Sequence, residues 1–339
     1  TFYLCLSAGG VLAGLFAGLL APRLFTYYFE WRIALVAGFA LTAVVLFQAT
    51  RPLWHDRFWL FMPAVAIALC GLFWVGLHTR PDKKPVLIAL RNFYGVLRVA
   101  ERAADDPAEH DRVLYHGSIN HGVQFQHGER RREAVSYYSV ETGVGRLLSA
   151  LADTPGLRVG VIGLGTGTLA TYARPGQVYR FYEIDPDVVH LSRSYFSYLR
   201  DSRGQIEVAL GDARLTLDRE REPPLHALAV DAFSGDAIPT HLLTREAMDI
   251  YLRRLRPDGA LAVHISNRHL DLAPVVRALA AYAGWQAVHI SNRRREGEHY
   301  AADWIIVTRN PVVLAALREH ATPPKGRDLL WTDESNDLF

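Results

Sequence analysis

Cysteine, methionine and zinc-type motifs are all scarce in this sequence of 339 residues. There are two cysteines and two methionines. Cys5 and Cys70 are too few for a disulfide framework, and both lie in long apolar stretches, so we expect them to be packing residues. No cluster of Cys and His has the spacing of a zinc site, and the sequence therefore implies no metal.

Charge is almost absent from the first 80 positions. Five of the 37 basic residues and two of the 35 acidic residues lie there, which leaves 32 basic and 33 acidic residues for the rest of the chain. That remainder is close to neutral and lacks the clustered basic face that nucleic-acid binding requires. We therefore expect no nucleic-acid partner.

Three stretches carry no charged side chain at all: Thr1–Pro22, Ile33–Thr50 and Phe58–His78. Each is close to the ~20 residues that cross a bilayer core. Aromatic residues that suit membrane interfaces lie near their ends, namely Tyr27, Tyr28, Trp31, Trp54 and Trp59. Residues 1–80 are therefore predicted to form at least three transmembrane helices in contact with the lipid bilayer.

Basic residues follow the third stretch: Arg80, Lys83, Lys84, Arg91 and Arg98. By the positive-inside rule they place everything after them in the cytoplasm. The chain begins at Thr1 rather than at methionine, so we expect further residues upstream. The prediction is an integral membrane protein with a cytoplasmic C-terminal part.

The part after residue 80 has two patterns. Residues 86–128 are rich in β-formers with glycine turns and predict a small β-hairpin unit. From residue 157 onward apolar strands alternate with helical stretches, which predicts a mostly parallel sheet covered on both faces. The predicted strands are 158–162, 178–183, 206–210, 226–231, 260–265, 286–290 and 304–308. Residues 129–320 thus form an α/β domain, and 321–339 a C-terminal tail.

A glycine-rich loop follows the first of these strands in "VIGLGTGT". Gly163, Gly165 and Gly167 permit a sharp turn and the close approach of a ligand. Glu183 ends the second strand, twenty residues after Gly163, where an acidic side chain can accept both ribose hydroxyls. Asp212 follows the third strand and can bind an adenine amino group. The G-x-G-x-G spacing favours S-adenosylmethionine, or its decarboxylated form, over a dinucleotide.

From about residue 86 to 339 the chain resembles spermidine synthase, and specifically the membrane-fused bacterial spermidine synthase-like proteins. The matching segments include "RNFYGVLRV", "HGSINHGVQ", "SYYSVETGVG", "VIGLGTGTLA", "YEIDP", "GDAR", "VDAFSGDAIPTHLLTREA", "HISNRHLDL" and "WTDESND". The resemblance implies a small β unit and a seven-stranded methyltransferase-like (Rossmann-like) domain. It also implies a bacterial inner-membrane location and transfer of an aminopropyl group from decarboxylated S-adenosylmethionine to a diamine such as putrescine. A homodimer is compatible with it.

The same resemblance assigns roles to individual residues. Asp231, at the end of the fourth strand, matches the catalytic aspartate, and a carboxylate there can take the proton of an amine. Tyr138 matches the substrate-side tyrosine. The other expected site residues are Gln124, Gly163, Gly165, Thr166, Gly167, Glu183, Asp212 and Ala213 for the nucleoside, and Tyr137 and Asp236 for the amine.

Several of these residues have simpler explanations. Asp231 could be a helix cap or a turn residue, and Asp236 could be an ordinary loop residue. Tyr137 and Tyr138 could be core aromatics. His264 is interpreted as a structural residue at a strand end rather than a base, and Asp333 and Glu334 either close the site or lie on the surface.

Thr166 departs from the family pattern, in which the glycine loop carries an aspartate that binds the amine of the decarboxylated donor. Without that carboxylate, repulsion of the carboxylate of intact S-adenosylmethionine is also lost. This leaves a methyltransferase, or another enzyme that uses intact S-adenosylmethionine, as a second hypothesis. A non-catalytic, membrane-coupled ligand sensor is the third.

Overall fold

The computed structural model describes residues 1–50, 66, 69–71, 73, 85–233, 239–267, 270–293 and 300–336. The chain divides into two compact units, Thr1–Val96 and Leu97–Phe339. The division falls inside the predicted β unit of residues 86–128, so its first strand belongs to the N-terminal unit.

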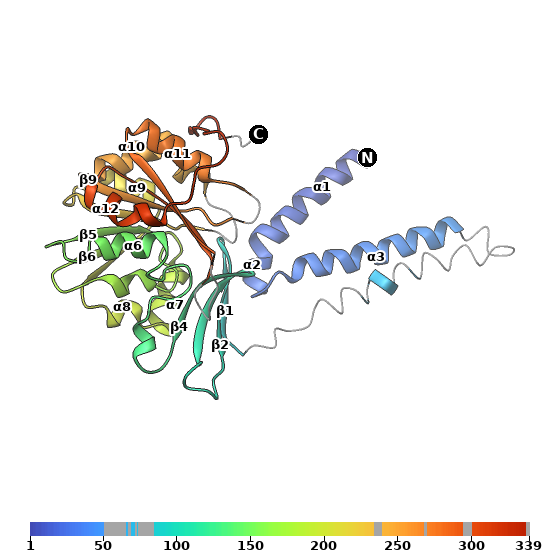
Figure 1. Cartoon of the computed structure of the whole chain (residues 1–339). Coiled ribbons are helices and arrows are strands. Elements are labelled where there is room, and N and C mark those ends of the chain that lie inside the picture. The colour runs from blue at the N-terminus through green and yellow to red at the C-terminus, as the bar shows by residue number, and fades with distance from the viewer. Residues whose placement is uncertain are drawn as a thin grey trace. The chain divides into compact units, whose positions relative to one another are not determined.

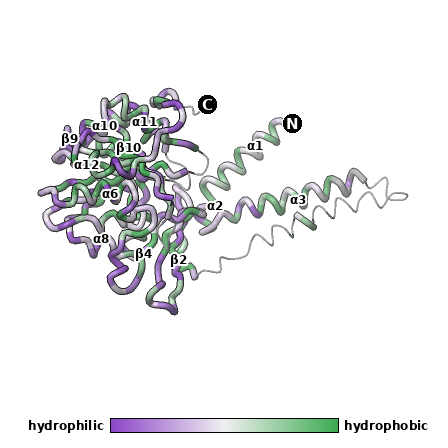
Figure 2. The backbone as a smooth tube through the Cα atoms, in the orientation of Figure 1, coloured by the Kyte–Doolittle hydropathy of each residue, from purple (hydrophilic) through white to green (hydrophobic). Residues whose placement is uncertain are grey.

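The N-terminal unit contains apolar helices and one strand. α1 (Phe2–Leu15), a π-helical turn η1 (Phe16–Leu20) and α2 (Ala21–Leu24) are continuous, and α3 (Phe29–Thr50) and β1 (Val86–Asn92) follow (Figure 1). Within the described residues, Phe2–Leu24 is the one helix long and apolar enough to be a membrane span or a signal sequence, with a mean hydropathy of 2.1 (Figure 2). It covers the first predicted span, and the second lies within α3. The third, with Trp54 and Trp59, lies almost wholly outside the described residues.

A buried ion pair links two distant segments of this unit. Arg91 in β1 donates to both carboxylate oxygens of Glu30 at the start of α3, at 2.9 and 2.5 Å, and to the carbonyl oxygen of Tyr27 at 2.9 Å. The Arg91 side chain is only 5% exposed, and its guanidinium lies 4.6 Å from the ring centre of Tyr28. Because both charged groups are satisfied, the pair fixes β1 to the beginning of α3.

The C-terminal unit begins with an antiparallel sheet of β2 (Gly95–Arg102), β3 (Asp111–His116) and β4 (Ile119–Phe125). A small core of Val113, Val123, Phe125 and Val135 lies on one face. The β-hairpin structure predicted within residues 86–128 is therefore confirmed.

The main sheet has seven strands in the order β10-β11-β9-β8-β5-β6-β7. The five strands from β9 to β7 are parallel, whereas β11 is antiparallel to both β9 and β10. The strands are β5 (Arg158–Ile162), β6 (Val178–Glu183), β7 (Gln205–Leu210), β8 (Leu225–Val230), β9 (Leu255–His264), β10 (Gln286–Asn292) and β11 (Ala302–Thr308). The predicted methyltransferase-like sheet is thus confirmed, and the antiparallel pair at its edge has no helix between its strands.

Helices cover both faces of this sheet. α9 (Ala213–Arg219), α10 (Arg245–Arg254) and α11 (Ala273–Tyr282) pack together on one face, and α6 (Gly143–Ala150) and α12 (Pro311–Leu317) pair on the other (Figure 1). The remaining helical segments are η4 (Glu129–Arg132), η5 (Thr168–Tyr172), α7 (Pro186–Tyr195), α8 (Tyr198–Asp201), η6 (Thr240–Leu242) and η7 (Arg318–His320). The stretch after the glycine loop is a short 3-10 helix, η5, instead of a full α-helix.

The predicted tail does not stand apart from this unit. Trp331 is 2% exposed and joins the apolar core between the sheet and the helices α9, α10 and α11. Its carbonyl oxygen accepts the backbone N–H of Arg245 at 2.8 Å. Burial of so large a ring fixes this part of the tail to the face of the sheet that α9, α10 and α11 cover.

Candidate active site

The glycine loop is pressed against the end of β8. Gly163 has a φ of 94°, and a Cβ on it would overlap the carbonyl oxygen of Asp231. The backbone N–H of Asp231 donates to Ile162 at 2.9 Å. Glycine is therefore required at position 163 by the close approach of two chain segments, in addition to any ligand.

Asp231 is nearly buried, and both its carboxylate oxygens have protein partners. The hydroxyl of Tyr138 donates to Oδ2, and Nδ1 of His264 lies 2.6 Å from Oδ1. The Asp231 side chain is 6% exposed. The structure thus brings together Asp231 and Tyr138, both of which were expected in the site, and Asp231 caps no helix among the described elements.

His264 is held rigidly beside this carboxylate. Its ring stacks between Trp304, at a centroid distance of 4.6 Å, and Tyr137, at 4.9 Å. Nε2 lies 2.8 Å from Oγ of Ser266, which itself accepts the backbone N–H of Asp303 at 2.8 Å. With that N–H occupying one lone pair, the Ser266 hydroxyl is free to donate to Nε2. We therefore assign the proton of a neutral His264 to Nδ1, which donates to Asp231.

The two tyrosines remain protonated. Burial, and then the negative charge of Asp231, raise the pKa of Tyr138 well above its ordinary value. The same two causes raise the pKa of Tyr137. Tyr138 therefore acts as a hydrogen-bond donor to the carboxylate over the whole physiological pH range.

His121, in β4, is a second imidazole that is influenced by the charge of this carboxylate. Burial, and then the neighbouring His116, lower its pKa to about 4, although the charge of Asp231 opposes this shift. Its Nε2 is buried and has no hydrogen-bond partner among the residues described. His121 is therefore neutral near pH 7 and keeps one polar ring atom available to a ligand.

Glu183 lies at the carboxyl end of β6, directly beside the glycine loop. Its Oε2 accepts the backbone N–H of Leu164 and its Oε1 that of Asp185, both at 2.9 Å. Burial raises the pKa of Glu183, and these two backbone hydrogen bonds oppose the shift. A carboxylate has further lone pairs, so this arrangement is able to accept ribose hydroxyls as well.

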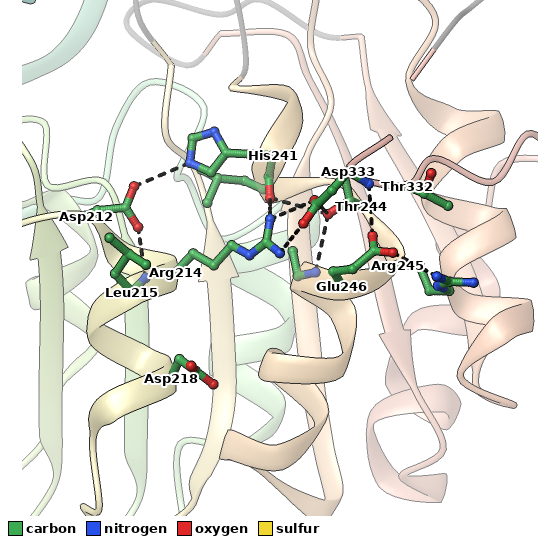
Figure 3. A network of polar contacts seen from close by, with 12 residues as sticks. Asp212, Arg214, Leu215, Asp218, His241, Thr244, Arg245, Glu246, Thr332 and Asp333 are labelled. Carbon is green, nitrogen blue, oxygen red and sulfur yellow. Dashed lines mark hydrogen bonds and ion pairs between the residues drawn. The ribbon is translucent and has the colours of Figure 1, made fainter. Parts of the chain in front are cut away.

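Asp212 lies at the end of β7 and caps α9. Its Oδ1 accepts the N–H of Leu215 at 2.8 Å, whereas its Oδ2 faces Nε2 of His241 at 3.4 Å (Figure 3). A groove of about 500 Å³ runs past it, lined by Asp212, Arg214, Leu215, Asp218, His241 and Ile250. Ala213 is buried within the first turn of α9. Oδ2 is thus the carboxylate atom without a backbone partner, and it faces His241.

Two predicted nucleoside residues instead make contacts within the protein. The amide of Gln124 is buried. Its Nε2 donates to the carbonyl oxygen of Arg131 and to the hydroxyl of Ser197, and its Oε1 accepts the backbone N–H of Ser197. Thr166 is fully buried, and its hydroxyl lies 2.9 Å from that of Thr168. Asp236 lies outside the described residues.

The sequence interpretation missed the contact between His264 and Asp231. Val230 and Val263 are direct partners in the parallel pair of β8 and β9, so Asp231 and His264 are the next residues of the two strands. The strand-end rule that selected Asp231 would also have selected His264, had it been applied to the fifth strand. Nothing in the sequence indicated His121 or Ser266.

The fold and part of the sequence resemble those of known proteins. A stretch of 112 residues is 32% identical to the polyamine aminopropyltransferase of Vibrio vulnificus, and covers 32% of this chain and 37% of that relative. The match thus spans little more than a third of the relative's length. A probable spermidine synthase from Corynebacterium glutamicum has the same fold, with a TM-score of 0.55 and 18% identity over 69% of this chain and 87% of the other. No protein-family model matches the chain. The chain is therefore spermidine synthase-like in its fold and, over those 112 residues, in its sequence.

Proposed function

We propose that the protein is an aminopropyltransferase that moves an aminopropyl group from decarboxylated S-adenosylmethionine to an amine such as putrescine. The observation that carries this proposal is the Asp231 carboxylate, which lies at a strand end beside the glycine loop between two fixed donors. The likeness to a polyamine aminopropyltransferase supports it.

The proposed reaction needs a neutral amine, whereas an aliphatic amine is protonated near pH 7. Asp231 accepts one proton from the ammonium group of the acceptor. The freed lone pair forms a nitrogen–carbon bond to the aminopropyl group. The carbon–sulfur bond breaks, and its electron pair goes to sulfur, which becomes the neutral thioether of methylthioadenosine. One proton is released overall, and Asp231 must return it to solvent.

Glu183, Asp212 and the glycine loop are proposed to hold the nucleoside. Glu183 and Asp212 each keep acceptor capacity at the ends of neighbouring strands. Ile184, which follows Glu183, and Leu215, which donates to Asp212, are apolar residues that are 44% and 55% exposed. A planar base is suited to cover such surface, which gives the adenine a place to bind.

Thr166 does not discriminate by charge between the decarboxylated donor and intact S-adenosylmethionine. It brings no negative charge to the glycine loop, so a donor that retains its carboxylate is not repelled there. Use of intact S-adenosylmethionine is accordingly the second candidate function. The hydrogen bonds of Asp231 to Tyr138 and His264 argue against a sensor without catalytic activity, because such a sensor does not need a general base.

We further propose that Phe2–Leu24 anchors the enzyme in the inner membrane, with the catalytic unit in the cytoplasm. Its length of 23 residues and its lack of charge up to Arg23 support this assignment. Fractionation of cells that express the protein tests it. Recovery from the soluble fraction, without detergent, would contradict it.

The decisive experiment identifies the products. The full chain in detergent is incubated with either donor and a panel of amines, and products are measured by mass spectrometry. We expect methylthioadenosine and an aminopropylated amine with the decarboxylated donor, and a loss of both in Asp231→Asn. Formation of S-adenosylhomocysteine from the intact donor would establish the second candidate instead.

A further inference from the structure

The C-terminal segment 331–336 is joined to the helices beside Asp212 by a set of polar contacts (Figure 3). Arg214, two residues after Asp212, donates to both carboxylate oxygens of Asp333, at 2.8 and 2.6 Å. The same guanidinium donates to the carbonyl oxygen of His241 at 3.0 Å. One side chain therefore links the first turn of α9, the segment η6 and the C-terminal segment.

Asp333 also contacts the beginning of α10. The Thr244 hydroxyl donates to its Oδ1 at 2.8 Å, and its own backbone N–H donates to Oε2 of Glu246 at 3.0 Å. Thr244 is the N-cap of α10. Arg214 is the main cause that lowers the pKa of Asp333 to about 2, so the carboxylate is ionised at every physiological pH.

These contacts lie around the proposed adenine site, and Arg214 also lines the groove beside Asp212. Oδ1 of Asp212 is occupied by the helix cap, so the direction of Oδ2 depends on the first turn of α9. His241, which faces Oδ2, belongs to η6. Arg214 and Thr244 hold the two elements that carry these groups, and Asp333 binds both residues.

We propose that Asp333 is a positioning residue for the nucleoside donor: through Arg214 and Thr244 it fixes the wall of the adenine site formed by α9 and η6. The inference rests on the proposed function, because it takes an adenine nucleoside as the ligand of Asp212. Small displacements of a binding group weaken binding strongly. Loss of the Asp333 contacts should therefore weaken binding of the donor and leave the amine site intact.

Binding of methylthioadenosine, measured by calorimetry on the full chain in detergent, tests this inference. We expect Asp333→Asn to bind it on the order of tenfold more weakly, as for the loss of a charge-assisted bidentate pair. Asp333→Glu, which keeps the carboxylate, should retain most of the affinity. The matched control is Asp328→Asn, which removes an ion pair between another arginine and the predicted tail of residues 321–339, Arg277–Asp328 at 2.7 Å, and should bind as the wild type does.

Steady-state kinetics separates positioning from a merely structural role. Positioning predicts a raised KM for the donor with an unchanged kcat and an unchanged KM for the amine. Equal affinity of Asp333→Asn and wild type, or equal losses in Asp333→Asn and Asp328→Asn, would overturn the inference. If Asp333→Asn does not fold, Arg214→Lys, which keeps the charge but loses the two-pronged contact, must show the same selective rise. Wild type that binds no methylthioadenosine would overturn the proposed function itself.

Discussion

Asp231 and His264 end two neighbouring parallel strands, and Nδ1 of the histidine lies 2.6 Å from Oδ1 of the aspartate. The imidazole cannot turn away, because Trp304 and Tyr137 stack on its two faces. One side of the carboxylate is therefore fixed before any substrate arrives. Tyr138 fixes the other oxygen, which leaves the remaining lone pairs to meet an amine.

Replacement of His264 tests the importance of this arrangement. We expect His264→Leu to lower kcat by roughly tenfold to a hundredfold, because a hydrogen bond to a charged group is typically worth about 1.5–3 kcal/mol. His264→Asn should recover much of the loss, because its side-chain amide can also donate to Asp231. Steady-state assays with both variants suffice for the test, and a folded Leu variant with the kcat of wild type would refute the role.

The donor preference is expected to respond to residue 166. Thr166→Asp places a negative charge in the glycine loop, which should favour the decarboxylated donor over intact S-adenosylmethionine by about one to two decades in kcat/KM. Thr166→Ser serves as the uncharged control. The ratio of kcat/KM for the two donors is the quantity to measure. An unchanged ratio in the Asp variant would show that this side chain does not reach the donor.

Gly122 is expected to be among the least replaceable residues of the small sheet. Its φ is 142°, and a Cβ on it would overlap the side chain of Thr166. Overpacking of this kind typically costs about 1–3 kcal/mol, so Gly122→Ala should unfold at a clearly lower denaturant concentration. Gly117→Ala provides the comparison, because Gly117 also has a positive φ, of 59°, but open space around it. Equal losses in both variants would mean that backbone strain alone is responsible.

His121 should give the protein a measurable loss of stability in mild acid. Its pKa in the folded chain is about 4, whereas an unfolded histidine titrates near 6.5. Between these two values the unfolded chain binds the additional proton, so stability is complete above pH 6.5 and falls as the pH decreases toward 4. The lost contribution amounts to roughly 3 kcal/mol.

The check for this pH dependence is a comparison of denaturant unfolding at several pH values. His121→Gln cannot titrate, so the difference in unfolding free energy between it and wild type should vary between pH 6.5 and 4. The groups that act on His121 are His116, Asp231 and His264. A difference that stays constant over this range would mean that His121 is already solvated in the folded state.

The sequence predicted the sheet far better than the contacts at its edge. β5 and β6 begin and end at the predicted residues, because most of their side chains are apolar or aromatic and a glycine lies shortly before each, at Gly156 and Gly176. The helical stretch expected after the glycine loop is the short 3-10 segment η5, and α12, which starts at Pro311 after the cap Asn310, was not predicted. Both are short segments in which tertiary packing outweighs local pattern.

In the candidate site, too, the sequence indicated residues at strand ends but not the contacts between distant segments. Asp231, Glu183 and Asp212 were found because strand ends are visible in a sequence. The hydroxyl of Tyr138 reaches Asp231 across 93 residues of chain. The Ser266 hydroxyl that decides the tautomer of His264 is held by the backbone of another strand, β11. Contacts of this kind follow from how strands and loops meet in space, and no local pattern encodes them.

The fit between Gly122 and Thr166 also has an evolutionary consequence. Gly122 lies in β4 and Thr166 in the glycine loop, 44 residues further along the chain, yet the volume available at one position depends on the residue at the other. Mutations in the glycine loop that alter donor choice are therefore epistatic with mutations in β4. A lineage, or a directed-evolution library, that varies residue 166 alone is limited to side chains that fit against Gly122. Larger changes become accessible only when both positions vary together.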